Sequence, residues 1–175
     1  SCLAESEKEP IEMRDRRING FTLIELLVTV AIIGLLVAIA VVNYRNAIDR
    51  ARQRRSMADM RGISMAVEAY AADFDRYPPA AAVTLPPGLS LPAANLLVAR
   101  PYLQPTYLQF LPVADGWNSW FLYSTTTTFS DYALSSSGLG GAPQTAPLGG
   151  PTTDFRDDII LVNGQFVQWP DGAQK

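Results

Sequence analysis

Glu25 is the residue in this chain best placed to do unusual chemistry, because it is the one charged residue in a long apolar segment. From Leu26 to Val42 the sequence is apolar apart from Thr29 and Gly34. A lone carboxylate inside a bilayer costs several kcal/mol, and intramembrane acids usually carry a function. Glu25 is therefore the first candidate for a functional residue.

The segment that carries Glu25 is long enough to cross a membrane. Residues 21–42 would form a helix of roughly 33 Å, which matches the apolar thickness of a bilayer. A plain membrane anchor would leave the carboxylate unexplained. A secretory signal would place its basic region at residues 14–17 and its cleavage site at residues 38–40. Against a secretory signal, Glu25 falls where the apolar core should be uninterrupted.

A specific motif surrounds Glu25. A basic stretch is followed by the six residues Gly20-Phe21-Thr22-Leu23-Ile24-Glu25. This pattern closely resembles the processing site of type IV pilins and of the pseudopilins of type II secretion. The resemblance implies that a prepilin peptidase cuts after Gly20 on the cytoplasmic side and that Phe21 becomes the N-methylated first residue. It also implies that Glu25 helps subunits dock into a helical filament.

The resemblance divides the chain into three parts. Residues 1–20 would be the cytoplasmic leader, residues 21–42 the membrane and assembly segment, and residues 43–175 the soluble domain. Two interpretations of the leader remain open: Met13 is the true start, or all of residues 1–20 form a longer leader. Under both, the leader is excluded from the mature fold.

Composition excludes several classes of function. The formal net charge of −3 does not suit a nucleic-acid-binding protein. The chain has no histidine, which removes histidine-based triads and metal ligands, and its one cysteine is Cys2 in the leader. The rival class is a membrane-anchored enzyme. Residues 135–137 supply hydroxyls, and Asp131 and Asp154 supply carboxylates, but no spacing supports a catalytic pair.

The apolar segment is predicted to continue as a water-exposed helix to about Tyr77, where Pro78 and Pro79 end it. Apolar residues at spacings of three and four predict the buried face of this helix. They are Met60, Ile63, Val67, Tyr70 and Phe74.

Strands are predicted in the second half of the chain, at residues 120–125 and 129–135, which are rich in aromatic and β-branched residues. Asn163-Gly164 between two apolar runs predicts a hairpin over residues 158–169, because both central residues of its turn need a positive φ. Residues 138–151 read as a loop. The expected fold is α+β and pilin-like, with the long N-terminal helix packed on a small antiparallel sheet.

Later motifs point to one branch of the family, the major pseudopilins of type II secretion. Each motif is short, but their order along the chain is similar to that of this branch. They are Arg76-Tyr77-Pro78, Leu111-Pro112, Asp115-Gly116-Trp117-Asn118, Tyr132-Ala133-Leu134-Ser135-Ser136-Ser137-Gly138 and Asp154-Phe155-Arg156-Asp157-Asp158-Ile159. The expected function is therefore that of a structural filament subunit rather than an enzyme. The alternative is a type IV pilin for adhesion or motility.

The same resemblance implies a calcium ion, held by carboxylates and main-chain oxygens in the loop between the last strands. Oxygen ligands of this kind suit Ca²⁺. The matching positions are Leu134, Ser137, Asp154, Asp157 and Asp158. The sequence departs from the family where an acidic residue usually follows Ser137-Gly138, because Leu139 stands there. The alternative is that these carboxylates are only solvated loop residues.

Location and partners follow from the resemblance. Six arginines between residues 45 and 61 would favour a cytoplasmic C-terminal part by the positive-inside rule. Cleavage requires Gly20 in the cytoplasm, however, so we expect a single-pass inner-membrane protein with its domain in the periplasm, or on a cell-surface filament for a pilin. Expected partners are other copies of the chain, minor pseudopilins, the prepilin peptidase, an inner-membrane assembly platform with its ATPase, and membrane lipid before assembly.

Overall fold

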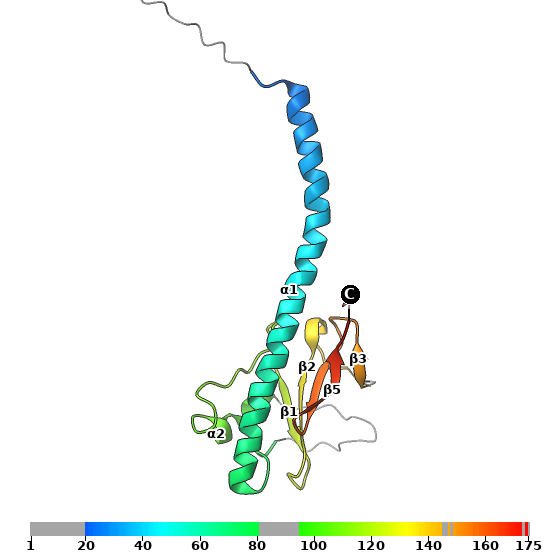
Figure 1. Ribbon diagram of the computed structural model, residues 1–175. Helices are drawn as coiled ribbons and strands as arrows, with labels where there is room; N and C mark the ends of the chain where they lie inside the picture. The colour runs from blue at the N-terminus through cyan, green and yellow to red at the C-terminus, as the bar shows by residue number, and fades with distance from the viewer. Residues whose placement is uncertain (1–19, 81–94, 145–146, 148, 173, 175) are drawn as a thin grey trace, which may run out of the picture. The chain divides into compact units, whose positions relative to one another are not determined.

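A computed structural model describes residues 20–80, 95–144, 147, 149–172 and 174 of the chain. The chain divides into two compact units, residues 1–40 and residues 41–175. The long helix α1 (Leu23–Phe74) begins in the first unit and ends in the second, which also contains a five-stranded sheet (Figure 1). The predictions for the leader that concern residues 1–19, including Cys2 and Met13, lie outside the described residues.

Helix α1 confirms the predicted long helix but ends earlier than expected. Its last residue is Phe74, and Asp75 takes a left-handed conformation with φ of 52°. Aspartate tolerates this conformation better than most residues do, so it can stop a helix. The amide of Tyr77, expected to lie within the last turn, instead donates to the carbonyl of Phe129 at 3.0 Å. The predicted end at Tyr77 is therefore wrong.

The buried face of α1 is the predicted stripe, with one exception. Met60, Ile63 and Val67 have no exposed area and Tyr70 has 5 %. Phe74 is 54 % exposed, so its assignment to the core is wrong. As the last residue of α1, Phe74 lies at the margin of the core and stacks on Tyr70 with ring centroids 4.5 Å apart.

Two short helical segments complete the cover of the core. The 3-10 helix η1 (Leu96–Ala99) leads directly into α2 (Arg100–Leu103). The side chain of Asn95 accepts from the amide of Leu97 at 3.0 Å and caps η1. Apolar side chains from both segments join the cluster that α1 forms with the sheet. They are Leu96, Ala99 and Leu103, all without exposed area.

The sheet has the order β1-β2-β4-β5-β3, and α1 lies along one of its faces (Figure 1). Its strands are β1 (Leu122–Thr125), β2 (Tyr132–Ser136), β3 (Gly150–Thr152), β4 (Ile159–Val162) and β5 (Gln165–Pro170). The pairings β1–β2, β2–β4 and β4–β5 are antiparallel, as predicted. Leu134 lies opposite both Tyr123 and Leu161. These three apolar residues form the middle of the face that receives the helix stripe.

The hairpin predicted from Asn163-Gly164 is present between β4 and β5. Asn163 has φ of 46° and Gly164 has φ of 79°, as the tight turn requires. Val162 pairs with Gln165 across the turn, and the register shifts between Ile160 and Leu161. The local turn chemistry therefore decided this element, which is why the sequence alone could predict it.

The strand β3 was not expected, because residues 138–151 read as a loop. It pairs with β5 in the parallel direction and makes an edge of an otherwise antiparallel sheet. Its residues are Gly-Pro-Thr, which carry no strand pattern. The strand forms because the outer edge of β5 offers free backbone groups, and tertiary pairing of this kind leaves no local signal.

Candidate functional site

The peptide bond predicted to be cleaved lies in an accessible, non-helical stretch. Gly20 and Phe21 precede α1 and are exposed, with Phe21 72 % exposed. A side chain at Gly20 would meet no atom within 4 Å in the subunit itself. The described part of the fold therefore has room for a larger side chain at this position.

Thr22 and Glu25 form a capping box at the start of α1. Thr22 donates to Glu25 Oε2 from its backbone N at 3.0 Å and from its Oγ1 at 2.7 Å. In return the amide of Glu25 donates to Thr22 Oγ1 at 3.3 Å. This reciprocal arrangement satisfies donors that a helix start leaves without partners. This role of Thr22 was not among the predictions from the sequence, although a threonine followed three residues later by a glutamate is the known signal of a capping box.

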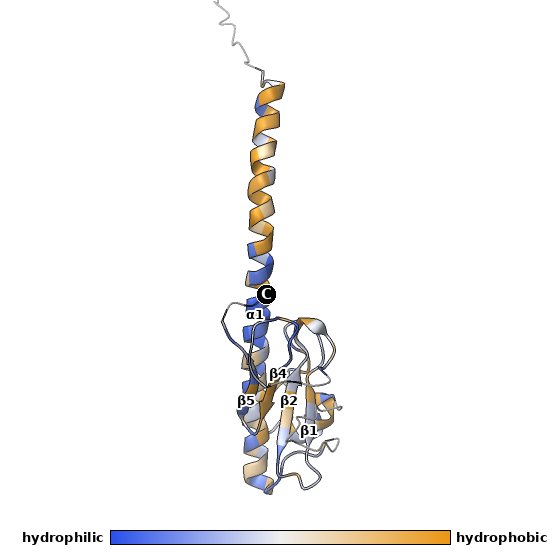
Figure 2. Cartoon of the chain, turned by 90° about the vertical axis from the view of Figure 1, so that its right-hand side faces the viewer, coloured by the Kyte–Doolittle hydropathy of each residue, from blue (hydrophilic) through white to orange (hydrophobic). Residues whose placement is uncertain are grey.

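The N-terminal part of α1 is apolar on every side. Large apolar side chains from Leu23 to Val42 are each more than 40 % exposed, and most of this stretch is coloured as hydrophobic in Figure 2. By length and composition α1 is able to cross a membrane. A helix that is apolar all round needs lipid or other helices around it. Glu25 interrupts this surface and lines a shallow groove with Phe21, Ile24 and Val28.

The motif that begins at Asp115 fastens a loop to α1. The amide of Gly116 donates to Ser56 Oγ at 2.9 Å, and the indole of Trp117 donates to Asp49 Oδ1 at 3.0 Å. A Cβ at Gly116 would come within 2.4 Å of the carbonyl oxygen of Arg52, so the backbones approach as closely as they can. The motif is thus explained by packing in this subunit.

Asp115 holds that loop in shape. Its Oδ1 accepts from the amides of Trp117 and Ser119, each at 2.9 Å, and its Oδ2 accepts from Ser136 Oγ at 2.7 Å. Asp115 is only 4 % exposed, and these bonds satisfy both of its oxygens. A buried carboxylate is tolerated when it is hydrogen-bonded in this way.

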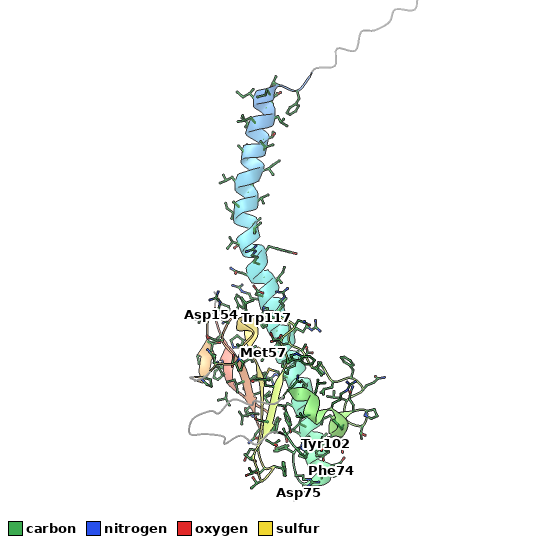
Figure 3. The ribbon with its side chains drawn as sticks, turned by 180° about the vertical axis from the view of Figure 1, so that it is seen from behind. Met57, Phe74, Asp75, Tyr102, Trp117 and Asp154 are labelled. Atoms are coloured by element: carbon green, nitrogen blue, oxygen red, sulfur yellow. The ribbon has the colours of Figure 1, made fainter. Side chains whose placement is uncertain are left out.

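The five residues predicted to bind calcium lie in different environments: Leu134 is at the centre of β2, whereas the other four lie after β2 or before β4. Leu134 is a core residue of β2, and Ser137 follows that strand. Asp154 is exposed (Figure 3), Asp157 is half-buried and Asp158 has no exposed area. Burial raises the pKa of the Asp158 carboxyl to about 6.

As arranged, these residues do not fit a calcium ion, which takes six to eight oxygen ligands. Asp154 Oδ1 accepts from the amide of Arg156 and Asp157 Oδ1 accepts from Gln144 Nε2, each at 2.9 Å. Only Asp158 Oδ1 is a buried oxygen without a hydrogen-bond partner in this group. Among the described residues, no three carboxylates, cysteines or histidines gather at a possible metal site. Calcium binding stays an untested prediction.

Two family descriptions match the chain. The prokaryotic N-terminal methylation motif matches residues 15–41, and the type II secretion system protein G family matches residues 43–149. The chain is 32 % identical to the type II secretion system core protein G of Pseudomonas aeruginosa, over 78 % of this chain and 97 % of the relative. It is 30 % identical to the protein of the same name from Aeromonas hydrophila, over 74 % of this chain and 88 % of the relative.

Type IV pilins are also similar, over a shorter stretch. The type IV major pilin protein PilA of Myxococcus xanthus is 39 % identical over 37 % of this chain and 31 % of the relative. No solved structure matches the chain at a significant level. The match to the protein G family covers most of the soluble domain and the relatives cover most of the chain, so this protein belongs to the type II secretion system protein G family, the major pseudopilins.

Proposed function

We propose that this chain is the structural subunit of a pseudopilus, the major pseudopilin of a type II secretion system. Residues 21–42 anchor it in the inner membrane before assembly, and its folded domain lies in the periplasm. The observation that carries the proposal is the lone carboxylate of Glu25 in residues 21–42, a stretch whose large apolar side chains are exposed on every side. The family membership supports the same function.

The apolar helix explains why the subunit would leave the bilayer only for a filament. Such a surface is stable against lipid and against other helices, but not against water. An assembled core of helices from several copies replaces the lipid with similar apolar side chains. Assembly can then proceed without exposing this part of α1 to water.

Glu25 would set the register of that assembly. After cleavage Phe21 carries a free cationic amine, and four residues of helix span only about 6 Å. In an apolar filament core, a carboxylate and an amine attract each other with little screening, and an unpaired charge is strongly penalised. The carboxylate of an incoming subunit is therefore drawn to the amine of a subunit already in place.

Processing and assembly need partners that act on this chain. A prepilin peptidase would cut after Gly20 and methylate Phe21, and an inner-membrane platform with its ATPase would draw subunits from the bilayer. Minor pseudopilins would share the filament. The chain itself would carry out no catalysis, because its role is mechanical. The methylation motif over residues 15–41 supports the processing step.

A type IV pilin remains the second candidate function, favoured by the similarity to PilA of Myxococcus xanthus. That match covers 37 % of the chain, whereas the protein G family matches residues 43–149. Genes for a secretin and exoproteins beside the gene for this chain would favour the pseudopilin. Genes for a retraction ATPase and motility would favour the pilin.

The deciding experiment replaces Glu25 with valine in the native host. Glu25→Val makes the helix more apolar, so membrane insertion and leader cleavage should persist while filaments disappear or become irregular on electron-microscope grids. Thr29→Val is the matched control, because it also places valine in the membrane segment but keeps the carboxylate. Regular filaments from a cleaved Glu25→Val subunit would contradict the role in register.

A further inference from the structure

The loop after β2 and the turn before β4 are packed backbone against backbone. The amide of Leu139 donates to the carbonyl of Phe155 at 2.8 Å. Gly138 has φ of 55°, and a Cβ there would come within 2.6 Å of the same carbonyl oxygen and 2.8 Å of that of Asp157. Main-chain oxygens that a metal ion could use are thus already covered by the loop itself.

Gln144 joins this loop to two carboxylates of the turn, the buried Asp158 and the half-buried Asp157. Its backbone N donates to Asp158 Oδ2 and its Nε2 donates to Asp157 Oδ1, each at 2.9 Å. Its Oε1 accepts from the amide of Asp158 at 3.4 Å. One side chain and its own backbone therefore bridge two adjacent aspartates, as a bound cation would.

Gln168 on β5 extends the bridge into the sheet. Its Nε2 donates to Gln144 Oε1 and to the carbonyl of Asp158, each at 2.8 Å, and its Oε1 accepts from the amide of Gly149 at 3.1 Å. Gln168 is 1 % exposed, and both polar atoms of its side chain have partners. It therefore fixes the end of the loop, the turn and β5 to one another.

We propose that Gln144 and Gln168 form an amide clamp that replaces a calcium ion in this subunit, so that its folded domain is stable without metal. An ion would hold the loop and the turn together by binding oxygens from both. The clamp holds the same segments by donating N–H groups to those oxygens. Leu139, which directly follows Gly138, adds no charge that an ion would need.

The clamp also disfavours binding of a cation, because it directs N–H donors at the carboxylate oxygens that a cation would use. The N–H groups of Gln144 point their positive ends at Asp157 Oδ1 and Asp158 Oδ2, so an ion at these oxygens would first have to displace Gln144. Asp158 Oδ1 is the one buried carboxylate oxygen of this group without a hydrogen-bond partner. One oxygen of one carboxylate falls well short of the six to eight ligands that calcium takes.

The first test is the thermal midpoint of the full chain in detergent micelles, measured with EGTA and with millimolar calcium chloride. A ligand that binds only the folded state raises the midpoint. The clamp predicts the same midpoint in both solutions. A midpoint that falls by about 5 °C or more in EGTA and recovers with calcium would overturn the proposal.

The second test removes the clamp. Gln144→Ala and Gln168→Ala leave buried polar groups without partners, which should lower the midpoint by about 5 °C or more in EGTA and in calcium alike. Gln165→Ala is the matched control, because Gln165 lies on the same strand as Gln168 but is exposed. Midpoints equal to that of Gln165→Ala would show that the amides do not hold the loop.

The third test converts the clamp into a site. Gln144→Glu keeps the size of the side chain but places a third carboxylate beside Asp157 and Asp158. The variant should melt well below the wild type in EGTA, because like charges repel, and calcium should restore it. If calcium does not raise the thermal midpoint of the Gln144→Glu variant, Gln144 does not occupy the position of an ion. This test concerns the folded domain, so it is independent of whether the chain forms filaments.

Discussion

Thr22 and Glu25 cap each other at the start of α1, and both hydrogen bonds from Thr22 end on the same carboxylate oxygen, Glu25 Oε2. Among the described residues, no hydrogen bond ends on Oε1. In the assembly proposed above, Glu25 would keep its own helix start capped through Oε2 while Oε1 binds the amine of another subunit. Docking would then not require the capping box to open.

The capping box predicts a defect for Thr22→Val. Loss of the cap should destabilise the first helical turn by about 1 kcal/mol. Amide hydrogen exchange at residues 23–26 in micelles should then be several-fold faster than in the wild type. Thr29→Val is the control, because Thr29 donates to the carbonyl of Leu26 within the helix and caps nothing. Equal exchange in the two variants would mean that Thr22 does not hold the helix start.

Processing predicts a defect for Gly20→Val. Gly20 has open space around it in the subunit, so a bulkier residue should leave the fold intact but block its fit in a peptidase cleft. The uncleaved chain should accumulate, while mass spectrometry of wild-type protein should show an N-methylated Phe21. Gly34→Ala, also in open space, should be processed normally. A mature N-terminus at Val41 would instead indicate a secretory signal.

Packing predicts opposite outcomes for two neighbouring positions on α1. Ile63 has no exposed area, whereas Met65 is 69 % exposed. In a soluble fragment of residues 43–175, Ile63→Asp would bury an unpaired charge and should unfold the domain, a loss of more than about 4 kcal/mol. Met65→Asp should change the thermal midpoint little. Similar midpoints for the two variants would mean that the buried face has been misplaced.

Glycine positions predict stability changes of opposite sign. Gly116→Ala would force a Cβ against the carbonyl of Arg52 and should lower stability by about 1–3 kcal/mol. Gly62→Ala meets no atom within 4 Å inside a helix and should raise stability by up to about 1 kcal/mol. Chemical denaturation of both variants in the same fragment checks the two signs.

Two tyrosines predict a loss of stability at alkaline pH. A hydrogen bond to Asp73 raises the pKa of Tyr107 to about 12, and burial beside the charge of Glu68 raises the pKa of Tyr77 to about 12. The folded state therefore holds more protons than the unfolded state between about pH 10 and 12, so stability is full below pH 10 and falls as pH rises. Denaturation at several pH values should show this slope, and Tyr107→Phe should reduce it.

Local sequence signals predicted those elements that local chemistry decides. The stripe of α1 from Met60 to Tyr70 and the turn at Asn163-Gly164 follow from side-chain spacing and from backbone conformation, and both are present. The capping box also has a local signal, the spacing of Thr22 and Glu25, although it was not among the predictions. The end of α1, by contrast, depends on Asp75 adopting a left-handed conformation, which aspartate permits but does not require.

Other parts of the structure depend on partners far along the chain. Strand β3 forms against β5, and no pattern in Gly-Pro-Thr predicts that pairing. The contacts of Gln144 and Gln168 join residues 24 positions apart, so spacing could not have indicated them. In the calcium prediction, sequence order placed the acidic residues in one loop, but only the structure gives each carboxylate its donors.

The fastening of the Asp115 loop to α1 has a mechanical consequence. A force that pulls α1 towards its N-terminus would act first on the hydrogen bonds that join Gly116 to Ser56 and Trp117 to Asp49. Asp49 and Ser56 are closer to the N-terminus of α1 than the stripe from Met60 to Tyr70, so these hydrogen bonds would bear the force before the core contacts do. Traction on the helix is thus transferred to the loop and the sheet together, and the domain moves as one body instead of being peeled open from its core.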